Sequence, residues 1–142
     1  MDNKYSVSAD KMKLDKAMIH HFLSTKAYWS LGIPYEKVMR SIDNSLCFGL
    51  YLGEEQVGFA RVISDYTTVA YLGDVFITEE HRGIGLSKML VQHIMQHPDL
   101  QGLRRWILLT QDAHELYRKF GWNNIAAPER WMEIHNKNVY DH

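Results

Sequence analysis

A loop with two glycines is the part of this sequence best suited to binding an anion. Residues 71–88 read YLGDVFITEEHRGIGLSK, which predicts a strand over 71–77, a short acidic turn and a loop that opens a helix. Gly83 and Gly85 let the backbone approach a ligand closely. The helix N-terminus then presents free N–H groups and the positive end of the helix dipole. The loop therefore predicts a phosphate or pyrophosphate site.

Two standard phosphate motifs do not fit this loop. A dinucleotide fingerprint has a third glycine at the position where Lys88 stands, and a P-loop has Lys before Ser, whereas Ser87 precedes Lys88 here. The loop alone leaves two alternatives for its role. It could bind the phosphates of a nucleotide, or it could be a turn that uses glycine only for its shape.

Two charged side chains lie in otherwise apolar strands, and a histidine stands near the start of a later helix. Asp74 interrupts an apolar strand, where a buried carboxylate needs a partner, so it is either paired structurally or kept for function. Arg61 lies on the apolar face of the preceding strand and could pair with Asp74 or bind an acidic group of a substrate. His114 lies one helical turn before Tyr117 and is either a candidate base or a surface histidine near a helix start.

Composition limits the class of protein. The chain has 142 residues, about one domain, and 46% of them are apolar. A net charge of −1 gives no basic excess for nucleic acid. The single cysteine, Cys47, is expected in the core and favours a reducing compartment. With no secretory signal and no apolar run of roughly 20 residues, we predict one cytoplasmic domain over 1–142, without a nucleic-acid or membrane partner.

The periodicity of apolar residues predicts a mixed sheet interrupted by helices. Strands are expected over 5–8, 46–52, 57–63, 69–77 and 103–109, with one more between 122 and 134; helices are expected over 13–25, 34–44, from the glycine loop to about 97, and over 113–120. Short turns make the three strands from 46 to 77 an antiparallel meander, and the helical crossover makes 69–77 and 103–109 parallel.

Three finer features concern the second half of the chain. The run LRRWILL over 103–109 is apolar enough to predict a strand buried on both faces. Asp112, with Glu115 three residues later, resembles a capping box at the start of the helix that carries Tyr117. His93 and His97 are spaced like metal ligands, but no Cys or carboxylate completes the set, so we predict no metal.

Two motifs together resemble those of the GNAT (Gcn5-related N-acetyltransferase) family. Arg82-x-x-Gly85-x-Ser87 is similar to the family's R/Q-x-x-G-x-G/A signature, with serine at the last position. The segment AHELYRKFGW over 113–122 is similar to its A-x-x-L-Y-x-x-F-G-F helix. The strand before the loop and the order of elements also match, so the resemblance covers about 5–134. One departure is Thr110, where many members have Asn.

The resemblance implies a fold and a ligand. The fold is an α/β (α+β) arrangement with a mixed, largely antiparallel sheet of about six to seven strands, helices on both faces, and a splayed parallel pair at the ligand site. The implied co-substrate is acetyl-CoA, with its pyrophosphate on the amides of 83–88 beside Arg82 and its pantetheine arm along the strand end. The cofactor-binding residues are then Val75, Phe76, Ile77, Arg82, Gly83, Ile84, Gly85, Leu86, Ser87 and Lys88.

The same resemblance implies direct attack of an amine on the thioester. Tyr117 matches the family's acid for the leaving thiolate, with a core tyrosine as the alternative, and a backbone N–H near Val75 would stabilise the oxyanion. Asp74 or His114 would be the base. Tyr28 and Trp29, in the loop between the first two helices, would line the acceptor pocket with Arg61, unless the two aromatic residues only cover the core.

We therefore expect an N-acetyltransferase that acts on a small-molecule or peptide amine. A non-catalytic acyl-CoA-binding or regulatory module on the same fold is the alternative, because the base is unassigned and Thr110 departs from the family pattern. The acceptor cannot be read from the sequence. Because family members are often dimers, a homodimer remains open.

Overall fold

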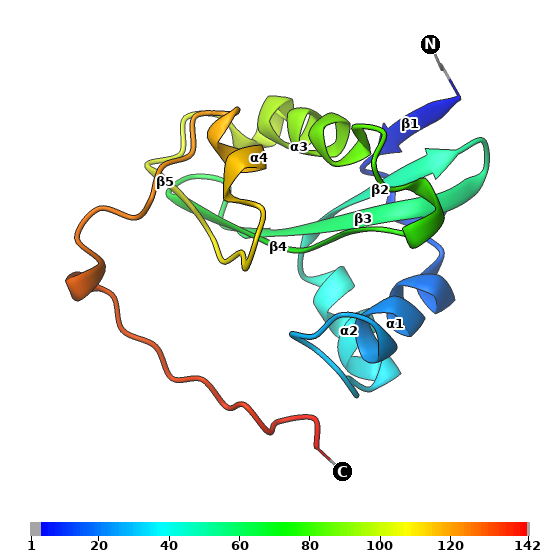
Figure 1. The fold of residues 1–142 in the computed structure, drawn as a ribbon, viewed down its shortest axis with the longest axis horizontal. Coiled ribbons are helices and arrows are strands. Elements are labelled where there is room, and N and C mark those ends of the chain that lie inside the picture. The colour runs from blue at the N-terminus through cyan, green and yellow to red at the C-terminus, as the bar shows by residue number, and fades with distance from the viewer. Residues whose placement is uncertain (1–3, 142) are drawn as a thin grey trace.

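One five-stranded sheet organises the computed structural model, which describes residues 4–141 (Figure 1). The strands lie in chain order: β1 (Tyr5–Ser8), β2 (Leu46–Leu52), β3 (Glu55–Ser64), β4 (Val69–Ile77) and β5 (Arg105–Leu108). Neighbouring strands from β1 to β4 are antiparallel, and β4 pairs with β5 in parallel. The predicted meander and the predicted parallel pair are both confirmed.

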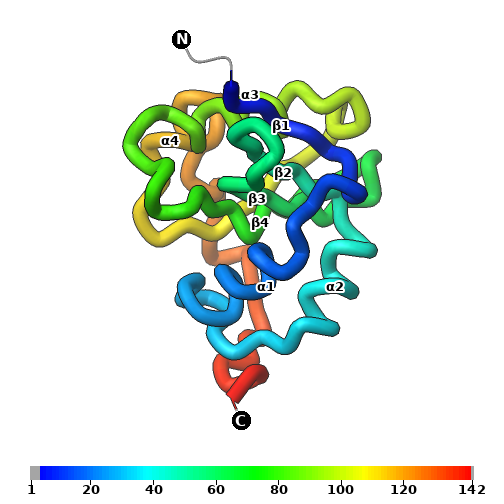
Figure 2. The backbone as a smooth tube through the Cα atoms, turned by 90° about the vertical axis from the view of Figure 1, so that its right-hand side faces the viewer, coloured from blue at the N-terminus to red at the C-terminus, as the bar shows by residue number. Residues whose placement is uncertain are grey.

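Helices cover both faces of this sheet, as expected (Figures 1 and 2). The bounds are α1 (Lys16–Thr25), α2 (Tyr35–Asp43), α3 (Leu86–Gln96) and α4 (His114–Arg118), with short 3-10 turns at Lys11–Lys13, Glu79–His81, Pro98–Leu100 and Pro128–Arg130. The first two helices lie on one face and the last two on the other. Within residues 4–141, no helix is long and apolar enough to cross a membrane.

Each face of the sheet packs its own hydrophobic cluster. Leu50, Val62 and Leu72 pack against α3 residues such as Leu90 on one face. On the other face, α1 and α2 pack over β2 to β4, where the rings of Phe22 and Phe76 stack with centroids 3.9 Å apart. Cys47 belongs to this second cluster, and burial raises the pKa of its thiol to about 11. The prediction of a core cysteine is confirmed.

Two helix starts differ from the predictions because side chains cap them differently. The first helix begins at Lys16 rather than near 13, since the Asp15 carboxylate accepts a hydrogen bond from the Met18 amide. The capping box predicted at Asp112 is wrong: α4 has no side-chain bond at its N-cap, Ala113. Instead, the Thr110 hydroxyl accepts a hydrogen bond from the Ala113 amide at 3.0 Å.

The fifth strand is shorter and more exposed than its composition predicts. It spans Arg105–Leu108 instead of 103–109, with Arg105 exposed and the other three residues half-buried. Leu109, the last residue of the apolar run, is 82% exposed. The strand is not buried on both faces because it forms an edge: only β4 pairs with it in the described part of the chain.

The strand expected between 122 and 134 is absent from residues 4–141, so the sheet has five strands rather than six or seven. After Trp122 the chain leaves the sheet and runs as an extended arm past α1 and α2 (Figure 1). Its regular structure is limited to the 3-10 turn at Pro128–Arg130. Composition could not show this, because strand residues need a neighbouring strand to pair with.

Candidate active site

The glycine loop between β4 and α3 presents backbone N–H groups without acceptors. Gly83 and Gly85 have φ angles of 82° and 87°, a conformation that side chains disfavour. Gly85 is the N-cap of α3 and its carbonyl accepts the Met89 amide. Among the bonds within residues 4–141, none uses an amide of 83–88 as donor. The loop thus offers a run of donors at a helix N-terminus, which is the chemistry of an anion site.

Arg82 fixes the loop to the end of β4. Its Nε donates to the Ile77 carbonyl at 2.9 Å, and its own amide donates to the Glu79 carbonyl. This contact leaves the rest of the guanidinium available for an anion at the loop. The structure thus places Arg82 beside the loop whose amides are unpaired.

The first half of β4 pairs with β5, but the second half has no strand partner on that side within residues 4–141. The parallel ladder runs from Val69–Arg105 to Leu72–Leu108 and then stops, while β4 continues to Ile77. The pairing with β3 also shifts here, since Phe59 faces Phe76 whereas Arg61 faces Gly73. This shift is a β-bulge, in which Asp74 takes a left-handed φ of 52°. In the part of the chain that the structure describes, residues 73–77 therefore have no strand partner on the β5 side.

Asp74 is held by two donors. Its Oδ2 accepts from Arg61 Nε at 2.9 Å, and its Oδ1 accepts from Trp29 Nε1 at 2.8 Å. Arg61 also donates through Nη1 to the Ser45 hydroxyl at 3.1 Å. Of the two alternatives for Arg61 and Asp74, the structure shows the ion pair. We name Trp29, Ser45, Arg61 and Asp74 the Asp74 cluster.

Tyr28 and Trp29 do not cover the core. They are 60% and 44% exposed, and their rings meet edge to face with centroids 5.1 Å apart. The bond from Trp29 to Asp74 brings the loop between α1 and α2 over the bulge of β4. The structure therefore gathers Tyr28, Trp29 and Arg61, which sequence analysis assigned to the acceptor pocket, around the candidate base Asp74.

Tyr117 and His114 lie on α4, on the opposite face of the sheet from α1 and α2 (Figure 1). Tyr117 is buried, and burial raises the pKa of its hydroxyl to about 12. Its ring packs beside that of Trp122. His114 is exposed at the first position of the helix. A phenol with so high a pKa stays protonated at neutral pH and can act only as a proton donor there.

Sequence analysis missed three parts of this arrangement. Ser45 gave no signal, because a serine beside a strand is common in turns. The bond between Trp29 and Asp74 joins residues 45 positions apart, so spacing could not show it. The role of Thr110 as a cap had one signal, a hydroxyl three residues before Ala113.

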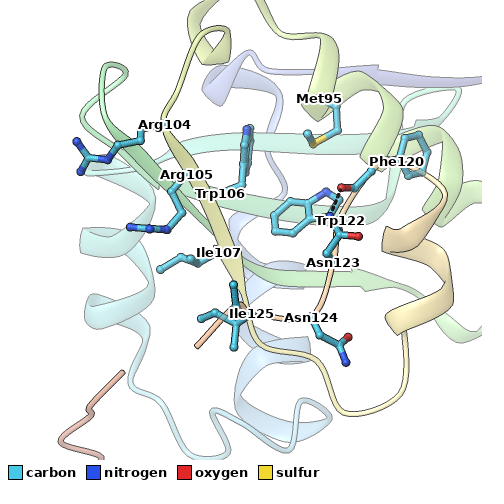
Figure 3. A pocket seen from close by; sticks show the side chains of 12 residues that line it. Met95, Arg104, Arg105, Trp106, Ile107, Phe120, Trp122, Asn123, Asn124 and Ile125 are labelled. Carbon is cyan, nitrogen blue, oxygen red and sulfur yellow. Dashed lines mark hydrogen bonds between the residues drawn. The ribbon is translucent and has the colours of Figure 1, made fainter. Parts of the chain in front are cut away.

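Two clefts lie away from the loop, along the outer edge of β5. One has a volume of about 390 Å³ and lies between β5 and residues 120–126 (Figure 3). The other, about 330 Å³, is lined by Arg105, Ala126, Arg130 and Trp131. Neither includes the glycine loop or the Asp74 cluster.

Comparisons with known proteins agree with this geometry. Residues 16–122 match the family model described as the acetyltransferase (GNAT) family. A Gibberella zeae protein named as a candidate acetyltransferase, FG08082, is 34% identical over 137 residues, covering 81% of this chain and 76% of the relative.

Solved structures show the same fold. A candidate GNAT acetyltransferase from Xanthomonas campestris pv. campestris superposes with a TM-score of 0.94 at 50% identity, over 97% of both chains. A candidate acetyltransferase from Deinococcus radiodurans shares the fold alone, with a TM-score of 0.76 at 16% identity over 97% of this chain and 92% of the other. The protein belongs to the GNAT acetyltransferase family.

Proposed function

We propose that the protein transfers an acetyl group from acetyl-CoA to a primary amine of a small molecule or peptide. The observation that carries this proposal is the run of unpaired amides over 83–88 at the start of α3. Such a run fits the pyrophosphate of CoA, and the open backbone of 73–77 fits a pantetheine arm that extends the sheet. Val75, Phe76 and Ile77 would contact that arm, and Gly83 to Lys88 the pyrophosphate.

Acetyl-CoA would supply the activated acetyl group, and residues of this chain would place and protonate the reacting atoms. The bulge disturbs the β-ladder at Asp74 and Val75, which supports a backbone N–H near Val75 as the donor to the oxyanion. Tyr117 is the proposed acid for the leaving thiolate. Its raised pKa, about 12, keeps the hydroxyl protonated at the pH of the reaction.

The contacts favour His114 over Asp74 as the base that removes the proton from the amine. Both oxygens of Asp74 already accept hydrogen bonds within the protein, one from the Trp29 indole and one from the Arg61 guanidinium, so the carboxylate has a structural role. His114 is exposed, and no hydrogen bond among residues 4–141 engages its ring. We propose that His114 acts through a water and that Asp74 fixes Trp29 and Arg61 beside the acceptor amine.

One observation favours the alternative, a non-catalytic acyl-CoA-binding module: the obvious carboxylate of the site is fully engaged by Arg61 and Trp29. The two functions share the CoA site and differ only in turnover. The third possibility is a protein that binds nucleotide phosphates. Its ligand would contact the glycine loop and would not pair with the backbone of β4.

Calorimetry with acetyl-CoA, ATP and NAD, followed by a turnover screen of amines, amino acids and peptides, tests the proposal. We expect acetyl-CoA to bind more tightly than either nucleotide and at least one amine to be acetylated. Binding without turnover across the panel would favour the module, and tighter binding of ATP or NAD would contradict the CoA site.

Tyr117→Phe tests the proposed acid. Loss of general acid catalysis is expected to lower kcat by at least about tenfold, with little change in the affinity for acetyl-CoA. The pH dependence provides a second readout. Since the folded pKa is raised from 10.0 to about 12, Tyr117 favours the folded state fully below pH 10, and this contribution is lost as pH rises from 10 to 12. Wild type should therefore lose about 1 kcal/mol more stability than Tyr117→Phe between pH 9 and 11.

Tyr66→Phe is the matched control, because Tyr66 is 46% exposed in the turn between β3 and β4. It should leave both kcat and the alkaline stability curve unchanged. An unchanged kcat and pH profile in Tyr117→Phe would remove Tyr117 as the acid and leave it as a core tyrosine.

A further inference from the structure

A hydrogen bond links the first strand of the sheet to the turn that precedes the glycine loop. The Tyr5 hydroxyl lies 3.0 Å from Nδ1 of His81, and the two rings meet edge to face with centroids 5.9 Å apart. A hydroxyl can donate or accept, so the bond forms with either tautomer of the imidazole. The contact joins residues 76 positions apart, and both lie outside the two family motifs, which begin at Arg82 and Ala113.

Tyr5 is a firmly held end of this bond. β1 forms the edge of the sheet opposite β5, and Tyr5 pairs there with Leu52 of β2 (Figure 1). Its ring is half-buried and packs against the hydrophobic cluster that includes the buried residues of α3. Because Tyr5 is held both by the strand ladder and by the core, its hydroxyl can fix a partner in place.

The segment on the other side of the bond has few anchors of its own. His81 ends the 3-10 turn Glu79–His81, and Arg82 to Gly85, which follow it, are all exposed. The other hydrogen bonds that residues 79–85 make within residues 4–141 stay local, since they reach only 77–79 on one side and Met89 on the other. The bond to Tyr5 therefore ties this exposed segment to a distant strand.

We propose that Tyr5, acting through His81, positions the glycine loop for acetyl-CoA, so that the first strand sets the affinity for this ligand. A loop with two glycines in left-handed conformations has many alternative forms. Holding its first end in the binding form reduces the conformational entropy that is lost when the ligand binds. This inference rests on the proposed acetyl-CoA site and adds a positioning residue from another strand.

Calorimetry with acetyl-CoA tests this role with variants that keep each aromatic ring. Tyr5→Phe removes only the hydroxyl and should raise the dissociation constant about two- to tenfold, the range expected for one hydrogen bond. Tyr35→Phe is the matched control, because the Tyr35 ring also meets a histidine edge to face, His20, with centroids 5.3 Å apart. His20 bonds the Ile33 carbonyl instead of that hydroxyl, so the control should keep wild-type affinity.

His81 offers a rescue experiment. His81→Phe keeps a ring without an acceptor and should weaken acetyl-CoA binding as much as Tyr5→Phe does. His81→Asn places an amide oxygen near the position of Nδ1, so its affinity should stay within about twofold of wild type. Adding Tyr5→Phe to His81→Asn should weaken binding again. A contribution to overall stability alone would not produce this pattern, because all of these proteins would be compared in the folded state.

Hydrogen exchange of the ligand-free proteins separates this inference from the proposed function. The His81 and Arg82 amides donate within the turn and should exchange about two- to tenfold faster in Tyr5→Phe than in Tyr35→Phe. Unchanged exchange, unchanged affinity in Tyr5→Phe, or failure of His81→Asn to restore binding would each overturn the inference. A wild type that binds no acetyl-CoA would contradict the proposed function, whereas exchange would still decide whether Tyr5 holds the loop.

Discussion

The glycine loop and the Asp74 cluster lie at either end of the second half of β4, and they differ in how their polar groups are satisfied. The loop presents amides over 83–88 that have no acceptor within residues 4–141. Asp74, in contrast, has both carboxylate oxygens bonded, to Arg61 and to Trp29. Unpaired donors favour binding of an external anion, whereas paired groups resist change. We therefore propose that the loop binds the ligand and that the cluster holds the shape of the site.

The largest effect, a loss of affinity for acetyl-CoA, is expected from a substitution in the glycine loop. Gly85→Val forces a branched side chain into a φ of 87°, which costs about 1–2 kcal/mol or more if the loop keeps its form. The loop should relax instead and turn its amides away from the ligand. Calorimetry should then show a loss of acetyl-CoA affinity of about tenfold or more.

Gly53→Val controls for strain alone. Gly53 has a φ of 60° in the hairpin between β2 and β3, and a Cβ there meets nothing within 4 Å, as at Gly85. This variant should lose similar stability and keep its affinity for acetyl-CoA. Equal losses of affinity in the two variants would show that the loop has no special part in binding.

An intermediate effect is expected from breaking the ion pair in the cluster. Asp74→Asn keeps a residue that tolerates the left-handed φ of 52° but leaves Arg61, whose side chain is 17% exposed, without its counter-ion. We expect a loss of about 1–3 kcal/mol in the free energy of unfolding, measured in urea, with acetyl-CoA affinity unchanged.

The exposed ion pair between Arg118 and Glu115 provides the comparison. Glu115→Gln should change stability by less than about 0.5 kcal/mol, because the Glu115 side chain is 84% exposed. A loss of turnover in Asp74→Asn without any loss of stability would reverse the interpretation and make Asp74 the base.

The smallest effect is expected from the indole donor of the cluster. Trp29→Phe removes the hydrogen bond to Asp74 and keeps an aromatic ring, so a loss of about 0.5–1.5 kcal/mol in unfolding free energy is expected. Combined with Asp74→Gly, which removes the same bond and tolerates the left-handed φ of 52°, the two changes should be less than additive. Trp131→Phe, at a tryptophan of similar exposure, should have no effect. Full additivity would show that the bond contributes nothing.

Local patterns predicted most of the fold. Alternating apolar residues gave β2 and β4 their bounds, and the helical crossover gave the parallel pairing of β4 with β5. The cap at Thr110 is a local bond that was missed because Asp112 and Glu115 offered a competing capping pattern. The extent of β5 was not predicted, since it depends on which groups meet in space. The strand expected between 122 and 134 is missing for the same reason: alternation shows that a segment can be a strand, while pairing requires a neighbour.

The sequence by itself determined the glycine loop, because glycine at 83 and 85 and the start of a helix are properties of adjacent residues. It also determined that Arg61 and Asp74 needed partners. Only the tertiary structure decided that they are partners of each other and that Trp29 completes the set, since these contacts join α1–α2, β3 and β4. Hydrogen bonds between distant segments follow from the packing of the sheet and helices, which spacing along the chain does not record.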